Sequence, residues 1–264
     1  MIICDDREFA FVHIPKCAGT SFRKALRQID TTGEAFSRIV THPALGDVHL
    51  AHLPLGDLRD HFPDEFEKVT RYRSMAVVRD PVARFASAIM QRLREFKLVP
   101  QSRISRAVFE AEARAVIELL RTDPARLDVE HVHFRRQCDY VELDGRRLIA
   151  DLFSFGQLDL AADHVERLTG IRVGEDKQNP TAQLRFAPLR PLQRLVRDRY
   201  ATLLPARQRA RIRERMFKAG LYQSTRTEDF IQPGGAVEAF INDHYARDFD
   251  IVQECADRSR ACAA

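Results

Sequence analysis

The chain has 264 residues, of which 45% are hydrophobic and 30% charged, and its formal net charge is +4. This composition supplies enough apolar residues for a sizeable core and excludes a disordered or fibrous chain. The mild positive charge suits anionic ligands but lacks the concentration typical of a nucleic-acid-binding protein. We therefore expect a single globular domain over residues 1–264 that binds small anions and no nucleic acid.

The sequence shows no pattern typical of a targeting segment or of a metal site. In the opening MIICDDREFAFVHIPK, two aspartates come too early for a signal peptide and the apolar run is too short for a membrane anchor. The five cysteines are scattered without zinc-site spacing, and no third ligand follows the pair His131-x-His133 at a characteristic distance. We expect a cytoplasmic protein without an integral membrane segment, a disulfide framework or a metal site.

Apolar segments and helical patterns alternate along the chain. Compact apolar runs predict strands over Phe9–Ile14, Val48–Leu53, Ser74–Val78 and Asp151–Phe155. Apolar residues at helical spacing predict helices that include residues 22–29 and 85–93, and further helices over 107–120 and 161–169. Strands separated by helices indicate an α/β protein with a central parallel sheet flanked by helices on both faces.

An arginine-rich stretch extends from residue 185 to 218, with ten arginines and one lysine against one aspartate and one glutamate, a local charge of +9. Its prolines divide it into short helical pieces. A solvated face is the usual explanation for such charge. The functional alternative is a groove that recognises an acidic acceptor.

The loop after the first predicted strand consists of Lys16, Cys17, Ala18, Gly19, Thr20 and Ser21. A loop that leaves a strand and opens a helix presents free backbone N–H groups and the positive end of the helix dipole. Gly19 lets the backbone approach an anion closely, two hydroxyls can donate to it, and Lys16 adds a full charge. We interpret the loop as a phosphate or sulfate site; the alternative is a plain turn in which Thr20 or Ser21 caps the helix.

Two segments carry a family resemblance. HIPKCAGTSF resembles the 5′-phosphosulfate loop of the sulfotransferase superfamily, particularly its carbohydrate sulfotransferase branch, and AVVRDPVARFASAI resembles the 3′-phosphate motif of that branch. Weaker likenesses in HFRRQCDYV, DLFSFGQLDL and HYARDFDIV extend the resemblance over most of the chain. It implies a P-loop-like three-layer fold and transfer of a sulfuryl group from 3′-phosphoadenosine-5′-phosphosulfate (PAPS) to a hydroxyl acceptor. A carbohydrate is the expected acceptor, and an acidic saccharide would suit the basic stretch.

The resemblance assigns the loop residues 16–21 to the 5′-phosphosulfate, and Arg79 and Ser87 to the 3′-phosphate. Arg79 follows a predicted strand at the end where ligands gather in open α/β sheets, and its planar fork suits phosphate oxygens. Ser87 comes eight residues later, about two helical turns along, and could donate from the same side. The alternative is that Arg79 forms a surface ion pair with Asp80 and that Ser87 lies on a helix surface.

Sulfuryl transfer needs a base for the acceptor's proton, and neutral histidine is the natural candidate near pH 7. His49 and His52 share the predicted strand 48–53, where an odd separation directs them to opposite faces. We predict His52 as the base because it ends that strand, with Lys16 stabilising the leaving phosphate. The alternatives are that His49 is the base, or that both histidines are structural. For His13 we expect a packing role, and for Cys17 that of a small loop filler.

A nucleotide kinase is the rival enzyme, because it shares the strand, phosphate loop and helix. Its P-loop requires lysine after the second glycine of G-x-x-x-x-G-K-[ST]. Here Lys16 precedes the glycine of the loop, which argues against ATP chemistry.

Overall fold

The computed structural model describes residues 1–122, 126–174, 182–184, 222–224 and 226–263. The chain divides into two compact units, one of Met1–Asp176 with Phe230–Ala264 and the other of Lys177–Asp229. The described part of the second unit includes an antiparallel strand pair, β9 (Ala182–Leu184) and β10 (Tyr222–Ser224). The arginine-rich stretch lies outside the described residues, so its role stays a prediction. All the predicted site residues lie in the first unit, unit 1.

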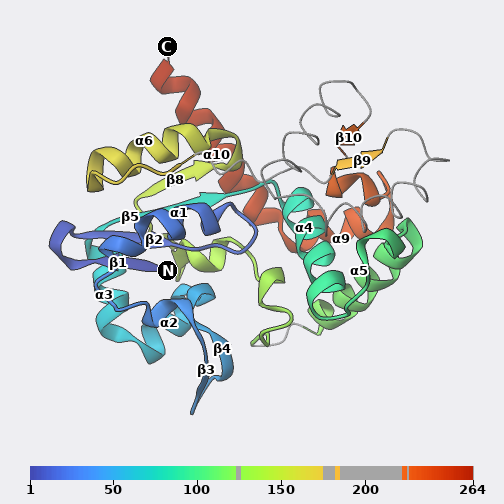
Figure 1. The fold of residues 1–264 in the computed structure, drawn as a ribbon, viewed down its shortest axis with the longest axis horizontal. Helices are drawn as coiled ribbons and strands as arrows, with labels where there is room; N and C mark the ends of the chain where they lie inside the picture. Colours follow the sequence, from blue (N-terminus) through green and yellow to red (C-terminus); the bar gives the residue numbers. More distant parts are fainter. Residues whose placement is uncertain (123–125, 175–181, 185–221, 225, 264) are drawn as a thin grey trace, which may run out of the picture. The chain divides into compact units, whose positions relative to one another are not determined.

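The central sheet of unit 1 has four strands in the order β1-β2-β5-β8. They are β1 (Ile2–Cys4), β2 (Phe9–Val12), β5 (Arg73–Val78) and β8 (Asp151–Ser154). Strands β2, β5 and β8 are parallel, and Figure 1 shows them side by side. Three of the four predicted strands are therefore confirmed, each to within two residues at its ends.

The sheet is mixed, whereas the sequence predicted a parallel one. Strand β1 pairs with β2 in the antiparallel direction, with Ile3 opposite Ala10. The short 3₁₀ helix η1 (Asp5–Arg7) and Glu8, whose φ is +45°, turn the chain back within four residues. Such a tight connection can only join antiparallel strands, since parallel neighbours need a long crossover.

Helices flank this sheet, which confirms the predicted α/β class. In unit 1 they are α1 (Gly19–Leu26), α2 (Leu55–His61), α3 (Pro63–Arg71), α4 (Pro81–Glu95), α5 (Arg106–Arg121), α6 (Leu158–Thr169), α9 (Ala236–His244) and α10 (Ala246–Ala263). Helix α3 packs against β1, β2 and β5, while α6 and α10 pack against β8. The predicted helices at 107–120 and 161–169 correspond to α5 and α6, and Gly170 ends α6 with a φ of +69°. Within the described residues, no helix is long and apolar enough to cross a membrane.

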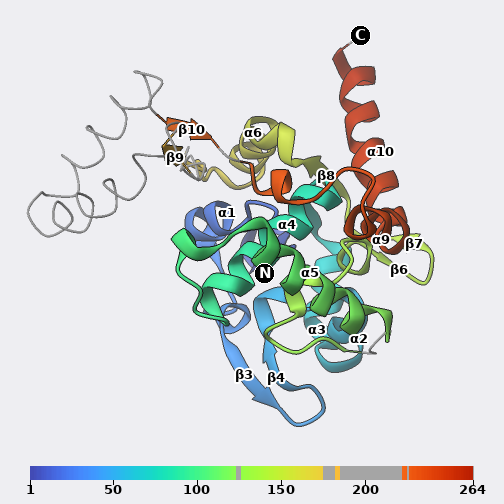
Figure 2. The same cartoon turned by 90° about the vertical axis from the view of Figure 1, so that its right-hand side faces the viewer.

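The predicted strand over Val48–Leu53 is wrong. Residues up to His49 form β4 (Gly46–His49), which pairs with β3 (Ile39–His42) in a separate hairpin that projects from unit 1 in Figure 2. The next three residues form the 3₁₀ helix η4 (Leu50–His52). The chain turns at His49 because its ring accepts a hydrogen bond from the Ala51 N–H, and both Leu50 and Ala51 are buried. Consecutive buried residues suit a helical turn better than an alternating strand.

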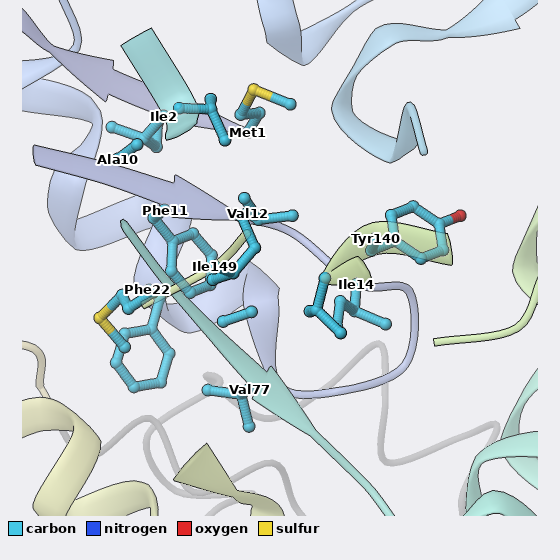
Figure 3. Packing of buried hydrophobic residues seen from close by; sticks show 14 of the residues in the cluster. Met1, Ile2, Ala10, Phe11, Val12, Ile14, Phe22, Val77, Tyr140 and Ile149 are labelled. Atoms are coloured by element: carbon cyan, nitrogen blue, oxygen red, sulfur yellow. The ribbon is translucent and has the colours of Figure 1, made fainter. Parts of the chain in front are cut away.

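Two apolar clusters hold unit 1 together. The larger surrounds the sheet, where Phe22 of α1 stacks on Phe11 of β2 with ring centroids 5.4 Å apart. Figure 3 shows both residues in this cluster together with Val77 of β5. The second cluster joins α4, α5 and α9. The phosphate loop leaves the first cluster from the end of β2, so its path is anchored by packed apolar side chains.

Candidate active site

The predicted phosphate loop connects β2 to α1 through an unusual backbone. Lys16 and Ala18 have φ angles of +66° and +61°, while Cys17 between them is not left-handed. Alternation of this kind is typical of nests, in which successive N–H groups face one concave side and can bind an anion. Ala18 is the N-cap of α1, and its methyl side chain cannot accept a hydrogen bond from the first turn. The structure thus rules out capping by Thr20 or Ser21, which are the second and third residues of α1.

Gly19 is required because the loop lies directly against His13. A Cβ atom at Gly19 would be only 1.8 Å from Cδ2 of His13, so no larger residue fits there without displacing the ring. His13 itself is buried, with 6% of its surface exposed. This confirms the packing role expected for His13 and fixes the loop to the histidine that follows β2.

Lys16 is oriented toward helix α4. Its Nζ donates to Oε1 of Gln91 at 2.9 Å, and burial lowers the pKa of the lysine, with the Arg94 charge as a smaller cause. Ser87 lies one turn before Gln91, and residues four apart share a helix face. Ser87, which is half-buried, is thereby on the side of α4 that meets the phosphate loop.

Arg79 is the first residue after β5, and its side chain reaches the phosphate loop. Its Nη1 donates to the backbone oxygen of Lys16 at 3.2 Å, and its guanidinium lies 4.5 Å from the centre of the Phe155 ring. The carboxylate of Asp80 instead accepts from the Ala83 N–H at 2.8 Å and caps α4. The structure brings Arg79 and Lys16, predicted to bind two different phosphates, into direct contact.

Four histidines form a cluster next to this loop. The ring centroid of His52 lies 4.6 Å from that of His13, 4.6 Å from that of His49 and 5.2 Å from that of His133. The expectation that His49 and His52 point to opposite faces is therefore wrong, because they belong to a turn and not to one strand. The cluster borders the phosphate loop through His13, because a Cβ atom at Gly19 would meet its ring.

The histidine cluster is neutral near pH 7. Burial lowers the pKa of His49 and of His133 to about 4, with the Arg23 and Lys16 charges respectively as the next causes. Burial also lowers the pKa values of His13 and His52 well below their usual value near 6.5. A neutral imidazole carries one free lone pair, which is the form that a general base requires.

Two further expectations concern Cys17 and the pair His131-x-His133. Cys17 is buried, its thiol donates to Oε1 of Gln137 at 3.3 Å, and burial raises its pKa to about 12, which agrees with the expected loop filler. His131 bonds through Nδ1 to Asp128 at 2.7 Å, while His133 belongs to the histidine cluster. The two side chains of the pair therefore have different partners.

Sequence reasoning missed several buried polar residues that support the site. Gln137, Arg84 and Asp248 are almost fully buried, with at most 1% of each exposed. Gln137 and Asp248 lie in the segments HFRRQCDYV and HYARDFDIV, which carried a family likeness but no assigned role. Both segments are rich in charged residues, so the sequence carries no signal that separates these buried side chains from exposed ones.

The parallel-strand edge combines the predicted phosphate loop, a neighbouring arginine and neutral histidines, which is the arrangement expected of an α/β enzyme for an anionic substrate. Residues 1–142, more than half of the chain, match the family model described as the Sulfotransferase family. The chain belongs to this family, and its activity is sulfuryl transfer; the nucleotide kinase alternative is accordingly set aside. Comparison with curated proteins and with solved structures gave no match.

Proposed function

We propose that this protein transfers a sulfuryl group from PAPS to a hydroxyl of a carbohydrate acceptor. The observation that carries the donor is the contact between the two predicted phosphate sites, in which Arg79 donates to the Lys16 carbonyl at 3.2 Å. PAPS bears phosphate at the 3′ position and phosphosulfate at the 5′ position, so it needs two cationic sites close together. The loop nest with Lys16 suits the 5′ group, and Arg79 with Ser87 suits the 3′ group.

In the proposed reaction the acceptor oxygen attacks sulfur while the bond from sulfur to the bridging phosphate oxygen breaks. The leaving group is 3′-phosphoadenosine 5′-phosphate, and its developing negative charge is stabilised by Lys16 and the loop N–H groups. The acceptor proton passes to a histidine. No metal is invoked in this scheme, because the chain's own cations supply the positive charge.

His52 is the proposed base, and hydrogen bonding at the cluster supports it over His49. Nδ1 of His52 lies 3.3 Å from the backbone oxygen of His13, which can only accept, so His52 carries its proton on Nδ1 and leaves Nε2 free. Nδ1 of His49 accepts from the Ala51 N–H at 3.3 Å, so its proton is on Nε2 and its lone pair is already used. Of these two histidines, His52 is thus the one that keeps a lone pair for the acceptor proton.

The direct test is to incubate the protein with labelled PAPS and a panel of neutral and acidic saccharides, in EDTA. Acceptor-dependent release of 3′-phosphoadenosine 5′-phosphate is the expected result. Transfer to phenols or peptide tyrosines, with no saccharide sulfated, would contradict the carbohydrate proposal while keeping the donor. Loss of all donor binding on chelation would contradict the metal-free scheme. The single domain over 1–264 and the cytoplasmic location stay predictions.

A further inference from the structure

Gln137 is a fully buried side chain that contacts both predicted phosphate sites. Its Oε1 accepts from the backbone N–H of Arg79 at 2.9 Å and from the thiol of Cys17 at 3.3 Å. Its Nε2 donates to the backbone oxygen of Arg79 at 2.8 Å. The side-chain amide therefore pairs with both backbone groups of Arg79, much as a neighbouring strand would, and at the same time holds the phosphate loop.

The contact between Gln137 and Arg79 lies beyond the point where strands β2 and β5 are paired with each other. Strands β2 and β5 are paired as far as Val12 and Ala76. Beyond Val12 the chain leaves the sheet toward the phosphate loop, whereas β5 stays paired with β8 as far as Val78, directly before Arg79. The guanidinium of Arg79, which is the group proposed to bind phosphate, also donates to the Lys16 oxygen in the loop. The Gln137 amide bonds to the backbone of Arg79 and to the Cys17 thiol, so it leaves the Arg79 guanidinium available for phosphate.

Gln137 is itself fixed from a distant part of unit 1. Its backbone N–H and that of Cys138 donate to the two carboxylate oxygens of Asp248 in α10, each at 2.8 Å. Asp248 is buried and lies 3.8 Å from Nη2 of Arg84. An amide held at its own backbone by a buried carboxylate has little freedom to shift, so it can act as a rigid spacer.

We propose that Gln137 is a positioning residue for the sulfuryl donor. Gln137 sets the spacing between the phosphate loop and Arg79. This spacing determines the preference for a nucleotide that is phosphorylated at both the 3′ and 5′ positions. This inference rests on the proposed PAPS donor. The two phosphates of such a nucleotide are joined through one ribose. The second phosphate therefore adds affinity only when its site lies at the matching distance from the first.

The test compares the affinities of 3′-phosphoadenosine 5′-phosphate and of 5′-AMP by calorimetry. Wild type should prefer the bisphosphate. Gln137→Met, which removes every amide bond at similar size, should reduce this preference about tenfold, the order expected for the loss of buried hydrogen bonds. Gln137→Glu keeps an oxygen for the Arg79 N–H but, when ionised, cannot donate to the Arg79 carbonyl. Its preference should lie between those of wild type and Gln137→Met.

Tyr245→Phe is the matched control, because it removes another buried bond, from the Tyr245 hydroxyl to the Phe134 oxygen at 2.6 Å, without touching either phosphate site. It should retain the wild-type preference. The preference is a ratio measured on one sample, so an unfolded fraction cancels. Equal weakening of both nucleotides by Gln137→Met, or an unchanged preference, would overturn the role of Gln137. A wild type without any bisphosphate preference would instead overturn the proposed donor.

Discussion

The phosphate loop and the histidine cluster are neighbours in unit 1, yet one presents charge and the other excludes it. The loop presents Lys16, which is half-buried, and backbone N–H groups turned by two left-handed residues. The cluster keeps its imidazoles neutral by burial, with His13 and His52 each only 6% exposed. In the proposed mechanism, anion binding and proton removal therefore depend on opposite local environments. Substitutions in the loop and in the cluster should affect the two separately.

The largest expected effect is a loss of turnover, and it distinguishes the proposed base from the donor site. His52→Ala should lower turnover by about 10²–10⁴, the range for loss of a general base, while affinity for 3′-phosphoadenosine 5′-phosphate stays close to wild type. Turnover with a saccharide acceptor and calorimetry with the bisphosphate measure the two quantities. His49→Ala serves as the control and should retain most of the turnover. If His49→Ala were inactive but folded and His52→Ala active, the base would be His49.

The next substitution tests the charged region, the phosphate loop with Arg79, in place of the neutral histidine cluster. Arg79→Ala should weaken binding of the bisphosphate by about 1.5–3 kcal/mol, the value of a charge-assisted hydrogen bond, with a much smaller loss for 5′-AMP. Calorimetry with both nucleotides measures this. Arg73→Ala is the matched control, because Arg73 begins the same strand β5 and pairs with Asp151 away from the loop. Equal losses for the two nucleotides would contradict a 3′-phosphate role for Arg79.

Gly19 lies where the phosphate loop contacts His13 of the histidine cluster. A side chain at this position should displace the loop or the His13 ring. Gly19→Ala places a methyl group 1.8 Å from Cδ2 of His13, so either the ring or the loop must move. We expect a loss of about 1–3 kcal/mol in the free energy of unfolding, as for overpacked cores, measured by urea denaturation. Gly56→Ala in helix α2, whose nearest neighbour would be Leu143 at 3.9 Å, should be neutral or stabilising. An unchanged stability of Gly19→Ala would show that the loop does not depend on this contact.

The last comparison concerns the pH dependence of stability. The pKa of His49 is lowered to about 4 in the folded protein but stays near 6.5 when unfolded, so acid protonates the unfolded chain first. The contribution of neutral His49 to stability is thus complete above pH 6.5 and is lost as the pH falls from 6.5 to about 4. The thermal midpoint should fall by about 2–4 °C for each kcal/mol lost.

His49→Asn isolates this contribution, because an asparagine oxygen can still accept the Ala51 N–H while carrying no titratable group. The variant should match wild type at pH 8 and lose less stability toward pH 4.5. An identical pH profile for both proteins would show that His49 titrates normally in the folded state.

Local sequence patterns predicted the elements that carry the phosphate sites. The apolar run before Lys16 and the proline after Arg79 define a strand followed by a helix in each case, and β2, α1, β5 and α4 appear as expected. Each of these elements depends on side chains within a few residues of one another. The same approach failed for Val48–Leu53, because six residues with four apolar side chains fit a strand and a buried 3₁₀ turn equally well.

By itself the sequence determined the strand–loop–helix units, the family likeness and the candidate residues Lys16, Gly19 and Arg79, because these follow from short-range spacing and backbone chemistry. Only the tertiary structure decided which histidine keeps a free lone pair and which polar group holds the two phosphate sites together. The bond from Gln137 to Asp248 joins residues 111 positions apart. Partners so distant are selected by how the helices pack on the sheet, and their chain separation leaves no periodic pattern in the sequence.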